Sequence, residues 1–379
     1  MKFLHLADLH LGKRYNELSL IDDQKYILDK ILEICAAENP DGVIIAGDVY
    51  DKTVPTAEAV ELFDRFLSEL HRRKITVLSV SGNHDSAERL GFGSALMSEG
   101  GAYFSPVYSG NVEPVILKDG YGEVAVYLLP FIKPSTVRRF FGDRQIESYT
   151  DAVGAAIEAM DLDLLRRNVL VAHQFVTGSL RSGSEEFNVG DVGNVDAAVF
   201  SPFDYVALGH IHGAQNVGSE KVRYAGAPLK YSLSEAGKGK SVTVVEIKEK
   251  GSLSVRCVPL VPMRDMVEIR GKYEEITNRN FYGGTTLNVD LVHIVLTDEN
   301  EAVDALGKLR LIYPNVMSVR YDNARARAAS ALDALDEVPA RTPSELFSSL
   351  YEAQNGKPMT FEQSALIGKL IEKVWGEDK

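Results

Sequence analysis

The sequence is poor in cysteine and in positive charge. Its 379 residues include two cysteines, Cys35 and Cys257, with no CxxC spacing. They predict buried free thiols rather than a disulfide, which is typical of the reducing cytosol. Asp and Glu outnumber Lys and Arg by 54 to 41, giving a formal net charge of −13. Because this charge opposes binding of a polyanion by the chain as a whole, such binding must depend on local basic patches, bound metal or a partner.

The sequence also lacks a long apolar segment. It has no run of 18 apolar residues, and Asp8 places a charge in the first stretch, MKFLHLADLHLGK, before a signal-type apolar segment could be complete. We therefore expect neither a membrane span nor a secretory leader, and we expect a cytoplasmic protein without membrane contact. The hydrophobic content of 45% is ample for packed cores, and the length predicts two or three domains.

Strand-like and helix-like segments alternate over the first 210 residues. The predicted strands are 2–8, 42–48, 75–83, 168–174 and 203–210, and the predicted helices are 21–38, 57–73, 86–98 and 151–167. Hairpins are predicted at 114–130, turning at Gly120 and Gly122, and at 240–260, turning at Lys250 and Gly251. Because the strands are apolar throughout rather than alternating, they should be buried on both faces. The sequence therefore predicts a layered α/β domain with helices outside the sheets.

The pattern changes near residue 262. Strand-like segments at 266–271, 292–298 and 316–322, with a helix-like segment at 300–314, predict a small βαβ-type domain. We expect four parts: a large domain 1–260, a small domain 261–322, a linker 323–341 and a two-helix segment 342–379.

The last segment has clear helix signals. Thr342 with Glu345, and Thr360 with Gln363, have the spacing of capping boxes, and apolar side chains recur at helical spacing in both helices. Such apolar faces usually pack on the protein's own core. The long polar linker before them favours docking on a partner instead.

Five predicted strands end in side chains that can bind metal. These residues are Asp8 and His10, Asp48, Asn83 and His84 followed by Asp85, His173, and His210 with His212. They include five of the eight histidines; the other three, His5, His71 and His293, lie inside strand or helix patterns and are interpreted as structural. Because open α/β folds collect ligands at the carboxyl ends of their strands, the five ends should meet in one site.

The mixture of ligands indicates the chemistry. Imidazole, carboxylate and one amide suit manganese, iron or zinc better than an all-oxygen set would. Two divalent ions bring +4, whereas Asp8 and Asp48 return −2, so the site would attract phosphate oxygens and favour a deprotonated water. A pair of ions about 3.5–4 Å apart suits phosphoester hydrolysis. Asp48, alone at its strand end, is the natural bridging ligand because a carboxylate has two oxygens.

In this order, the strand-end motifs resemble the calcineurin-like metallophosphoesterase superfamily. Four longer stretches are similar to the nuclease-subunit family of bacterial SbcCD complexes, related to the double-strand-break repair nucleases of archaea and eukaryotes. They are FLHLADLHLGKR at residues 3–14, AHQFVTG at 172–178, ALGHIHGAQ at 207–215 and YAGAPLKYSLSEAGKGKS at 224–241. The similarity extends over essentially the whole chain. It implies two sheets flanked by helices, a small α+β capping domain and a C-terminal helical pair.

The resemblance also implies how the site residues are shared. One ion would be held by Asp8, His10, Asp48 and His212, and the other by Asp48, Asn83, His173 and His210, with Mn²⁺ as the expected metal. His84 would lie beside the scissile phosphate as an acid or transition-state group, and Asp85 would orient it. Asp51 and Lys13 stay open: Asp51 is either a carboxylate behind the ligands or a surface residue, and Lys13 either contacts phosphate or is a solvated charge.

The activity implied by the resemblance is metal-dependent cleavage of DNA. Such subunits are single-strand endonucleases and 3′–5′ double-strand exonucleases that process hairpins and DNA ends with an SbcC-type ATPase in repair, recombination and replication. Residues 342–379 would bind the coiled coil of that ATPase, residues 261–322 would narrow access for DNA, and the chain would be a homodimer. Two alternatives stay open: a phosphoesterase of a small phosphodiester or cyclic nucleotide, and a non-enzymatic scaffold that recruits the ATPase.

Overall fold

The computed structural model describes residues 1–15, 18–180, 193–300 and 304–323, together with a few positions between 347 and 370. It divides into one compact unit, Met1–Val295 with Ala302–Arg320, and a second, Leu296–Glu301 with Tyr321–Lys379. Almost all of the predicted linker and most of the predicted two-helix segment lie outside the described residues. The predicted small domain falls largely within the first unit.

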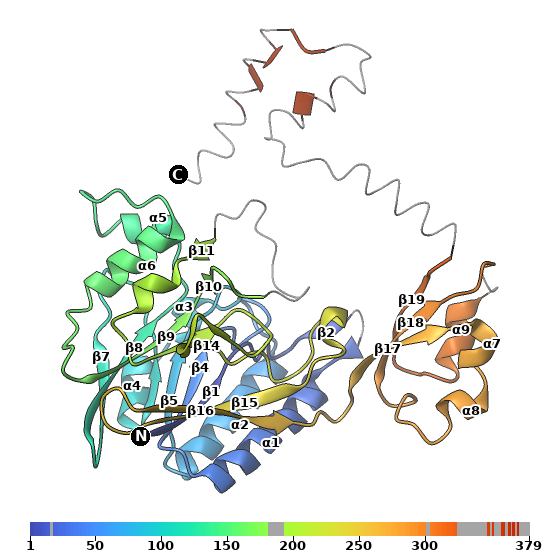
Figure 1. Cartoon of the computed structure of the whole chain (residues 1–379), viewed down its shortest axis with the longest axis horizontal. Coiled ribbons are helices and arrows are strands. Elements are labelled where there is room, and N and C mark those ends of the chain that lie inside the picture. The colour runs from blue at the N-terminus through green and yellow to red at the C-terminus, as the bar shows by residue number, and fades with distance from the viewer. Residues whose placement is uncertain are drawn as a thin grey trace. The chain divides into compact units, whose positions relative to one another are not determined.

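Two six-stranded sheets form the centre of the first unit (Figure 1). The first has the order β16 (Leu253–Leu260), β15 (Lys240–Ile247), β1 (Lys2–Leu6), β4 (Gly42–Ala46), β5 (Thr76–Val80), β6 (Ala102–Phe104). The second has the order β13 (Gln215–Val217), β14 (Ser219–Tyr224), β12 (Tyr205–Gly209), β9 (Arg167–His173), β8 (Gly122–Leu129), β7 (Pro114–Asp119). In the first sheet β1, β4, β5 and β6 are parallel, and in the second β8, β9, β12 and β14 are parallel. Antiparallel strands lie at the edges.

Side chains from the sheets and helices form three cores. Helices α1 (Ile21–Glu38) and α2 (Ala57–Arg72) pack on the outer face of the first sheet, and α6 (Tyr149–Glu158) packs on that of the second (Figure 1). The third core lies between the sheets and includes Phe3 and Tyr205. Along β1, Leu4 and Leu6 face the helices whereas Phe3 faces the other sheet. Both faces of the central strands are therefore buried, which confirms the predicted layered α/β architecture.

Two predicted helices differ from the structure. The helix expected at 86–98 is divided into α3 (Ala87–Leu90) and α4 (Ser94–Glu99), because Gly93 adopts a left-handed conformation with φ 72°. The helix expected at 151–167 begins at Tyr149 and ends at Glu158, before Asp161, which has φ 49°. Both hairpins are confirmed, since β7 and β8 pair, and so do β15 and β16.

A three-stranded sheet follows the second hairpin. Its order is β17 (Met266–Gly271), β18 (Leu291–Leu296), β19 (Val316–Tyr321), with helices α7 (Tyr273–Ile276), α8 (Arg279–Tyr282) and α9 (Ala305–Arg310). Met266 and Leu291 belong to the same core cluster as α1 and α2. Packing between the predicted first and second domains is therefore continuous.

Short elements complete the described chain. They are β2 (Arg14–Tyr15), β3 (Leu18–Ser19), α5 (Pro134–Arg138), β10 (Phe175–Val176), β11 (Asn194–Val195) and the 3₁₀ helices η1 (Ala197–Phe200) and η2 (Leu233–Glu235). Both cysteines are free thiols, as predicted, but only Cys35 is buried; Cys257 is exposed because it lies in β16, at the edge of the first sheet. Among the described helices, none combines the length and apolar character needed to cross a membrane.

Candidate metal centre

The predicted metal-binding residues meet where the parallel strands of both sheets end. Asp8 and His10 follow β1, Asp48 follows β4, His173 ends β9, and His210 follows β12. Backbone hydrogen bonds join the first two loops: Asp8 N–H donates to Gly47 O at 3.0 Å, and His10 N–H donates to Asp48 O at 2.9 Å. The two sheets thus present their ligands at one shared edge, as the sequence predicts.

Two glycines allow the loops to approach this closely. A Cβ on Gly82 would lie 2.1 Å from Asp48 Oδ1, and a Cβ on Gly209 would lie 1.8 Å from Ala46 O. Neither neighbour is a flexible side-chain end that can move away without disturbing the site. Both positions therefore need glycine for close packing.

Four of the predicted ligands have strained backbones. Asp8, His10, Asp48 and His210 have positive φ values of 53°, 44°, 49° and 99°. Residues other than glycine seldom adopt this region, and each such residue costs about 1–3 kcal/mol. The surrounding hydrogen bonds hold these turns, which aim the side chains into the site.

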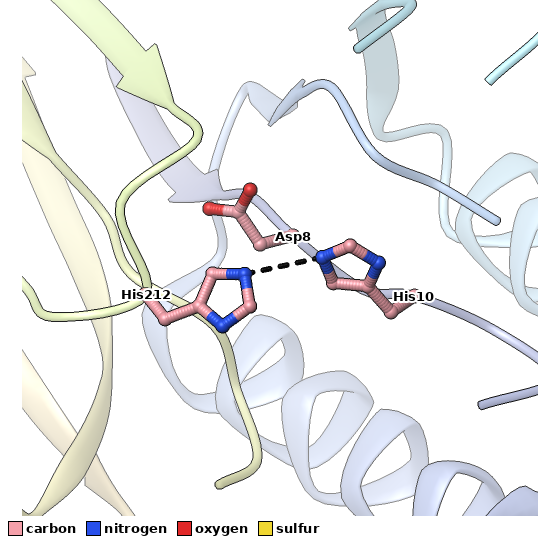
Figure 2. A group of neighbouring side chains, drawn as sticks. All are labelled: Asp8, His10 and His212. Carbon is pink, nitrogen blue, oxygen red and sulfur yellow. Dashed lines mark hydrogen bonds between the residues drawn. The ribbon is translucent and has the colours of Figure 1, made fainter. Parts of the chain in front are cut away.

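Asp8, His10 and His212 form the first part of the site (Figure 2). The Nε2 atoms of His10 and His212 face each other at 3.1 Å. Within the described part of the chain, the buried Asp8 Oδ2 atom has no hydrogen-bond partner. A buried carboxylate oxygen without a partner and two facing imidazole nitrogens indicate a cation site.

Asn83, His173 and His210 form the second part. Asn83 Oδ1 lies 2.9 Å from His173 Nε2 and 3.0 Å from His210 Nδ1. The other ring nitrogen of His173, Nδ1, lies 2.8 Å from Ala46 O and can only donate to it. In neutral His173 this contact leaves the Nε2 lone pair for a metal, which is the usual way that proteins orient a ligand imidazole.

Asp48 lies between the two parts. Its Oδ2 is 3.6 Å from His10 Nε2 and 3.3 Å from His173 Nε2. Its Oδ1 accepts a hydrogen bond of 2.8 Å from the backbone N–H of His84. This position fits the bridging role expected from the sequence.

His84 and Asp85 complete the site. The His84 ring meets the His10 ring edge-on, 4.8 Å between centroids, and its Nδ1 donates to Asp51 O at 3.1 Å. The Asp85 carboxylate accepts three backbone hydrogen bonds, from Val49, Tyr50 and Gly82, at 2.9–3.1 Å. Asp85 thus holds the loop after β4 against the loop after β5. These bonds fix the backbone around His84. The orientation of His84 by Asp85 stays a prediction.

In the metal-free protein, burial shifts the pKa values of the site in opposite directions. Burial raises the pKa of Asp8 to about 6 and lowers the pKa of His210 to about 3. For Asp48 and His173, mutual attraction outweighs the effect of burial. The pKa of His173 rises to about 9, and that of Asp48 falls well below its usual value. Asp48 is therefore ionised at neutral pH, as a bridging ligand must be.

These residues fit two divalent ions. Three overlapping groups, each with ligand atoms within 4.8 Å of one another, surround the site: Asp8 with His10 and His212, His10 with Asp48 and His84, and Asp8 with Asp48 and His173. When bound, two ions would acidify a water molecule and stabilise the charge that develops on a phosphoester. The structure also brings His84 into one of these groups, although the resemblance implies that His84 is not a ligand.

Four charged residues behind the ligands were missed or left open by the sequence. Asp51 Oδ1 accepts from Lys13 at 2.8 Å and lies 3.7 Å from His10 Nδ1, so Asp51 belongs to the surroundings of the site and Lys13 is its partner. Glu235, fully buried, lies 3.6 Å from His212 Nδ1 and pairs with Lys240. A lone Glu in the Ser- and Gly-rich stretch YSLSEAGKGKS gives no sequence signal of burial.

A cleft of about 630 Å³ opens beside the second part of the site. Asn83 and His210 line it, together with Lys133 and the aromatic residues Phe131, Tyr149 and Phe175. It is wide enough for a segment of an elongated substrate, and Lys133 offers it a positive charge.

Comparison with known proteins assigns the family. Residues 1–214 match the calcineurin-like phosphoesterase family, and residues 262–355 match the type 5 capsule protein repressor C-terminal domain family. The SbcD subunit of the nuclease SbcCD from Staphylococcus saprophyticus is 32% identical over 375 residues, which cover 98% of both chains. This chain belongs to the SbcD family. The SbcD protein of Staphylococcus epidermidis is 35% identical over 84% of this chain and 85% of its own length.

Membership in the SbcD family confirms the fold family predicted from the strand-end motifs. Among solved structures, a dimetal phosphatase from Danio rerio is 13% identical and covers 69% of this chain and 96% of its own. Its TM-score of 0.37 is too low to add to the assignment.

Proposed function

We propose that this chain is the nuclease subunit of an SbcCD-type complex and hydrolyses phosphodiester bonds in DNA with two divalent ions, preferably Mn²⁺. The observation that carries the proposal is the convergence of five strand ends around Asp48 in a family whose named members are nucleases. The activity would comprise single-strand endonuclease and 3′–5′ double-strand exonuclease cleavage, including hairpins and DNA ends, in repair, recombination and replication.

Each side chain has a role in this proposal. Asp8, His10, Asp48 and His212 hold one ion, and Asp48, Asn83, His173 and His210 hold the other. His84 lies at the border of the two groups and supplies a proton to the leaving oxygen or stabilises the transition state. Asp85 positions His84 by joining the loops on either side of it. Lys133 in the neighbouring cleft is suited to contact a backbone phosphate.

The remaining parts of the chain have roles of their own in the proposal. Residues 1–260 form the nuclease domain and residues 261–322 limit access for DNA, a division supported by the second family match beginning at residue 262. Residues 323–341 act as a linker, and residues 342–379 bind an SbcC-type coiled-coil ATPase. The working protein is a cytoplasmic homodimer. Family membership favours DNA over a small phosphodiester or cyclic nucleotide as the substrate, and it favours an enzyme over a scaffold.

A comparison of substrates tests the activity. The full chain with Mn²⁺ is incubated with single-stranded DNA, a DNA hairpin and bis-p-nitrophenyl phosphate, beside Asp48→Asn as a control that lacks the bridging carboxylate. We expect the wild type, and not the variant, to cleave the DNA substrates. Hydrolysis of the small diester without any DNA cleavage would leave the phosphoesterase alternative in place of the nuclease.

A truncation tests the partner. Deletion of residues 342–379 should abolish co-purification with an SbcC-type ATPase and leave Mn²⁺-dependent cleavage of short single-stranded DNA within about twofold. Co-purification of the shortened chain at wild-type yield would overturn the assignment of this segment.

A further inference from the structure

Glu235 lies behind the metal centre with both carboxylate oxygens engaged. Its Oε1 faces His212 Nδ1 at 3.6 Å and accepts from the backbone N–H of Tyr231 at 3.3 Å, and its Oε2 forms an ion pair with Lys240. The Glu235 side chain is fully buried, and the Lys240 side chain is 7% exposed. The carboxylate is thus enclosed by its partners and withdrawn from water.

Lys240 holds His212 at a second point. Besides pairing with Glu235, its Nζ donates to the backbone carbonyl of His212 at 2.8 Å. Lys240 begins β15, and Glu235 ends the 3₁₀ helix η2. The turn that follows η2 is closed by the bond from Lys238 N–H to Glu235 O at 2.9 Å. Residues 235–240 therefore contact both the ring and the backbone of His212.

Stability alone does not explain this pair. A buried ion pair usually contributes little net stability, because desolvation offsets the attraction and an apolar pair of similar volume serves as well. The pair does control the ring beside it. An ionised carboxylate at Nδ1 favours the proton on that nitrogen, which leaves the Nε2 lone pair directed at His10 and the ion position.

We propose that Glu235 is a positioning residue of the metal centre that fixes the tautomer and orientation of His212, with Lys240 as its counter-ion. The inference rests on the proposed metal site. It gives the stretch SLSEAGKGK, residues 232–240, the role of positioning His212. His10 has a looser version of the same arrangement, since its Nδ1 lies 3.7 Å from Asp51, which is paired with Lys13. The two histidines that face each other are thus each backed by a carboxylate–lysine pair.

Metal binding to the full-length chain provides the test. Mn²⁺ titration by calorimetry and Co²⁺ titration by visible absorption are compared between wild type and Glu235→Gln. We expect Glu235→Gln to weaken binding of one of the two ions by about 10- to 100-fold and to alter the Co²⁺ spectrum, while the other ion binds within twofold of wild type.

Two further variants separate positioning from mere support of the fold. Glu235→Gln alone leaves Lys240 buried without its counter-ion, and the double variant Glu235→Gln/Lys240→Met removes that unpaired charge. The melting temperature of the double variant should therefore recover towards wild type, while its affinity for that ion stays low. Asp265→Asn removes the 2.6 Å ion pair with Lys230, whose Nζ also donates to the carbonyl of Ala236, next to Glu235, and should leave both affinities unchanged.

The outcomes distinguish this inference from the proposed function. Wild-type affinity in Glu235→Gln, recovery of affinity in the double variant, or an equal loss in Asp265→Asn would each overturn the positioning role. A wild-type chain that binds two ions but does not cleave DNA would overturn the proposed nuclease and leave the role of Glu235 supported. A chain that binds no ion would overturn both.

Discussion

His84 is the side chain that most directly separates metal binding from chemistry. Its Nδ1 is committed to the carbonyl of Asp51, and its backbone N–H donates to Asp48. His84→Gln should therefore lower kcat for Mn²⁺-dependent DNA cleavage by about 10²- to 10⁴-fold while two ions still bind. Single-turnover cleavage and Mn²⁺ titration measure the two effects. Loss of one bound ion in this variant would mean that His84 is itself a ligand, with His10 and Asp48 as its neighbours.

At the residue scale, the sequence predicted the nine residues at the strand ends, but not the residues behind them that hold them in place. Asp8, Asp48 and His173 could be recognised because each polar side chain follows an apolar strand. Glu235 carried no such signal. Its partner His212 is distant in the sequence, and its partner Lys240 lies in a Gly- and Lys-rich stretch that gives no sign of burial. The three hydrogen bonds of the Asp85 carboxylate were also invisible in the sequence, because their donors are backbone amides, which every residue except proline has.

At the scale of strands, the contact between β12 and β4 leaves no space for a side chain at Gly209. Gly209→Ala would place a Cβ against Ala46 O, at 1.8 Å, and against His173 Nδ1, at 2.8 Å. The strand ends must then separate, so we expect a loss of Mn²⁺ affinity of at least tenfold and a lower melting temperature. Gly120→Ala, in the turn between β7 and β8, has nothing within 4 Å of the new Cβ and serves as the matched control. Equal behaviour of the two variants would contradict this explanation.

At the end of the sheets away from the metal centre, Arg167 links one sheet to the other. This buried side chain donates to Asp119 at 2.6 Å and 3.1 Å, and to the carbonyls of Ile247 and Lys248 in the other sheet. The hydrogen bonds from Arg167 hold the pKa of Asp119 well below its usual value. Because that pKa is lower in the folded state, the stabilisation is present above about pH 4 and is lost as the pH falls further.

Asp119→Asn should therefore lower the free energy of unfolding by about 2 kcal/mol at pH 7, and the difference from wild type should shrink as the pH falls from 4 towards 2. Urea denaturation across this range measures it. Glu158→Gln, which removes an exposed pair with Arg144, should change the free energy by less than about 0.5 kcal/mol. A deficit in Asp119→Asn that is independent of pH would rule out the charge as its cause.

The sequence predicted the strands better than the helix ends. Strand positions follow from apolar runs, and β17 and both hairpins lie within the predicted segments. The break between α3 and α4 and the end of α6 depend on single left-handed residues, Gly93 and Asp161, whose conformation is set by their surroundings.

For the whole molecule, the metal centre should be a source of stability. The residues proposed as its ligands come from both sheets, so ions should bind the folded chain and not the separated segments. Free Mn²⁺ at 100 times its dissociation constant should add about 2.7 kcal/mol per independent site, and EDTA should remove that gain. Chemical denaturation with and without Mn²⁺ measures it, and Asp48→Asn should show little of the gain. A wild-type stability independent of Mn²⁺ would contradict the assignment of the site.

The sequence was least able to predict relations between large parts. The small sheet contributes Met266 and Leu291 to the main core, although the change of pattern near residue 262 suggested separation. The predicted partner-binding segment, 342–379, lies mostly outside the described residues and stays a prediction.

The separation of the ligands along the chain also has a consequence for synthesis. His10 and His212 are 202 positions apart, and β1 pairs with β15, which begins at Lys240. During translation, the carboxylates of Asp8 and Asp48 emerge long before His212 and before β15 joins the first sheet. Cleavage activity should therefore be absent from ribosome-bound chains shorter than about 250 residues and appear only near completion of both sheets. A series of stalled chains assayed for DNA cleavage would measure this delay.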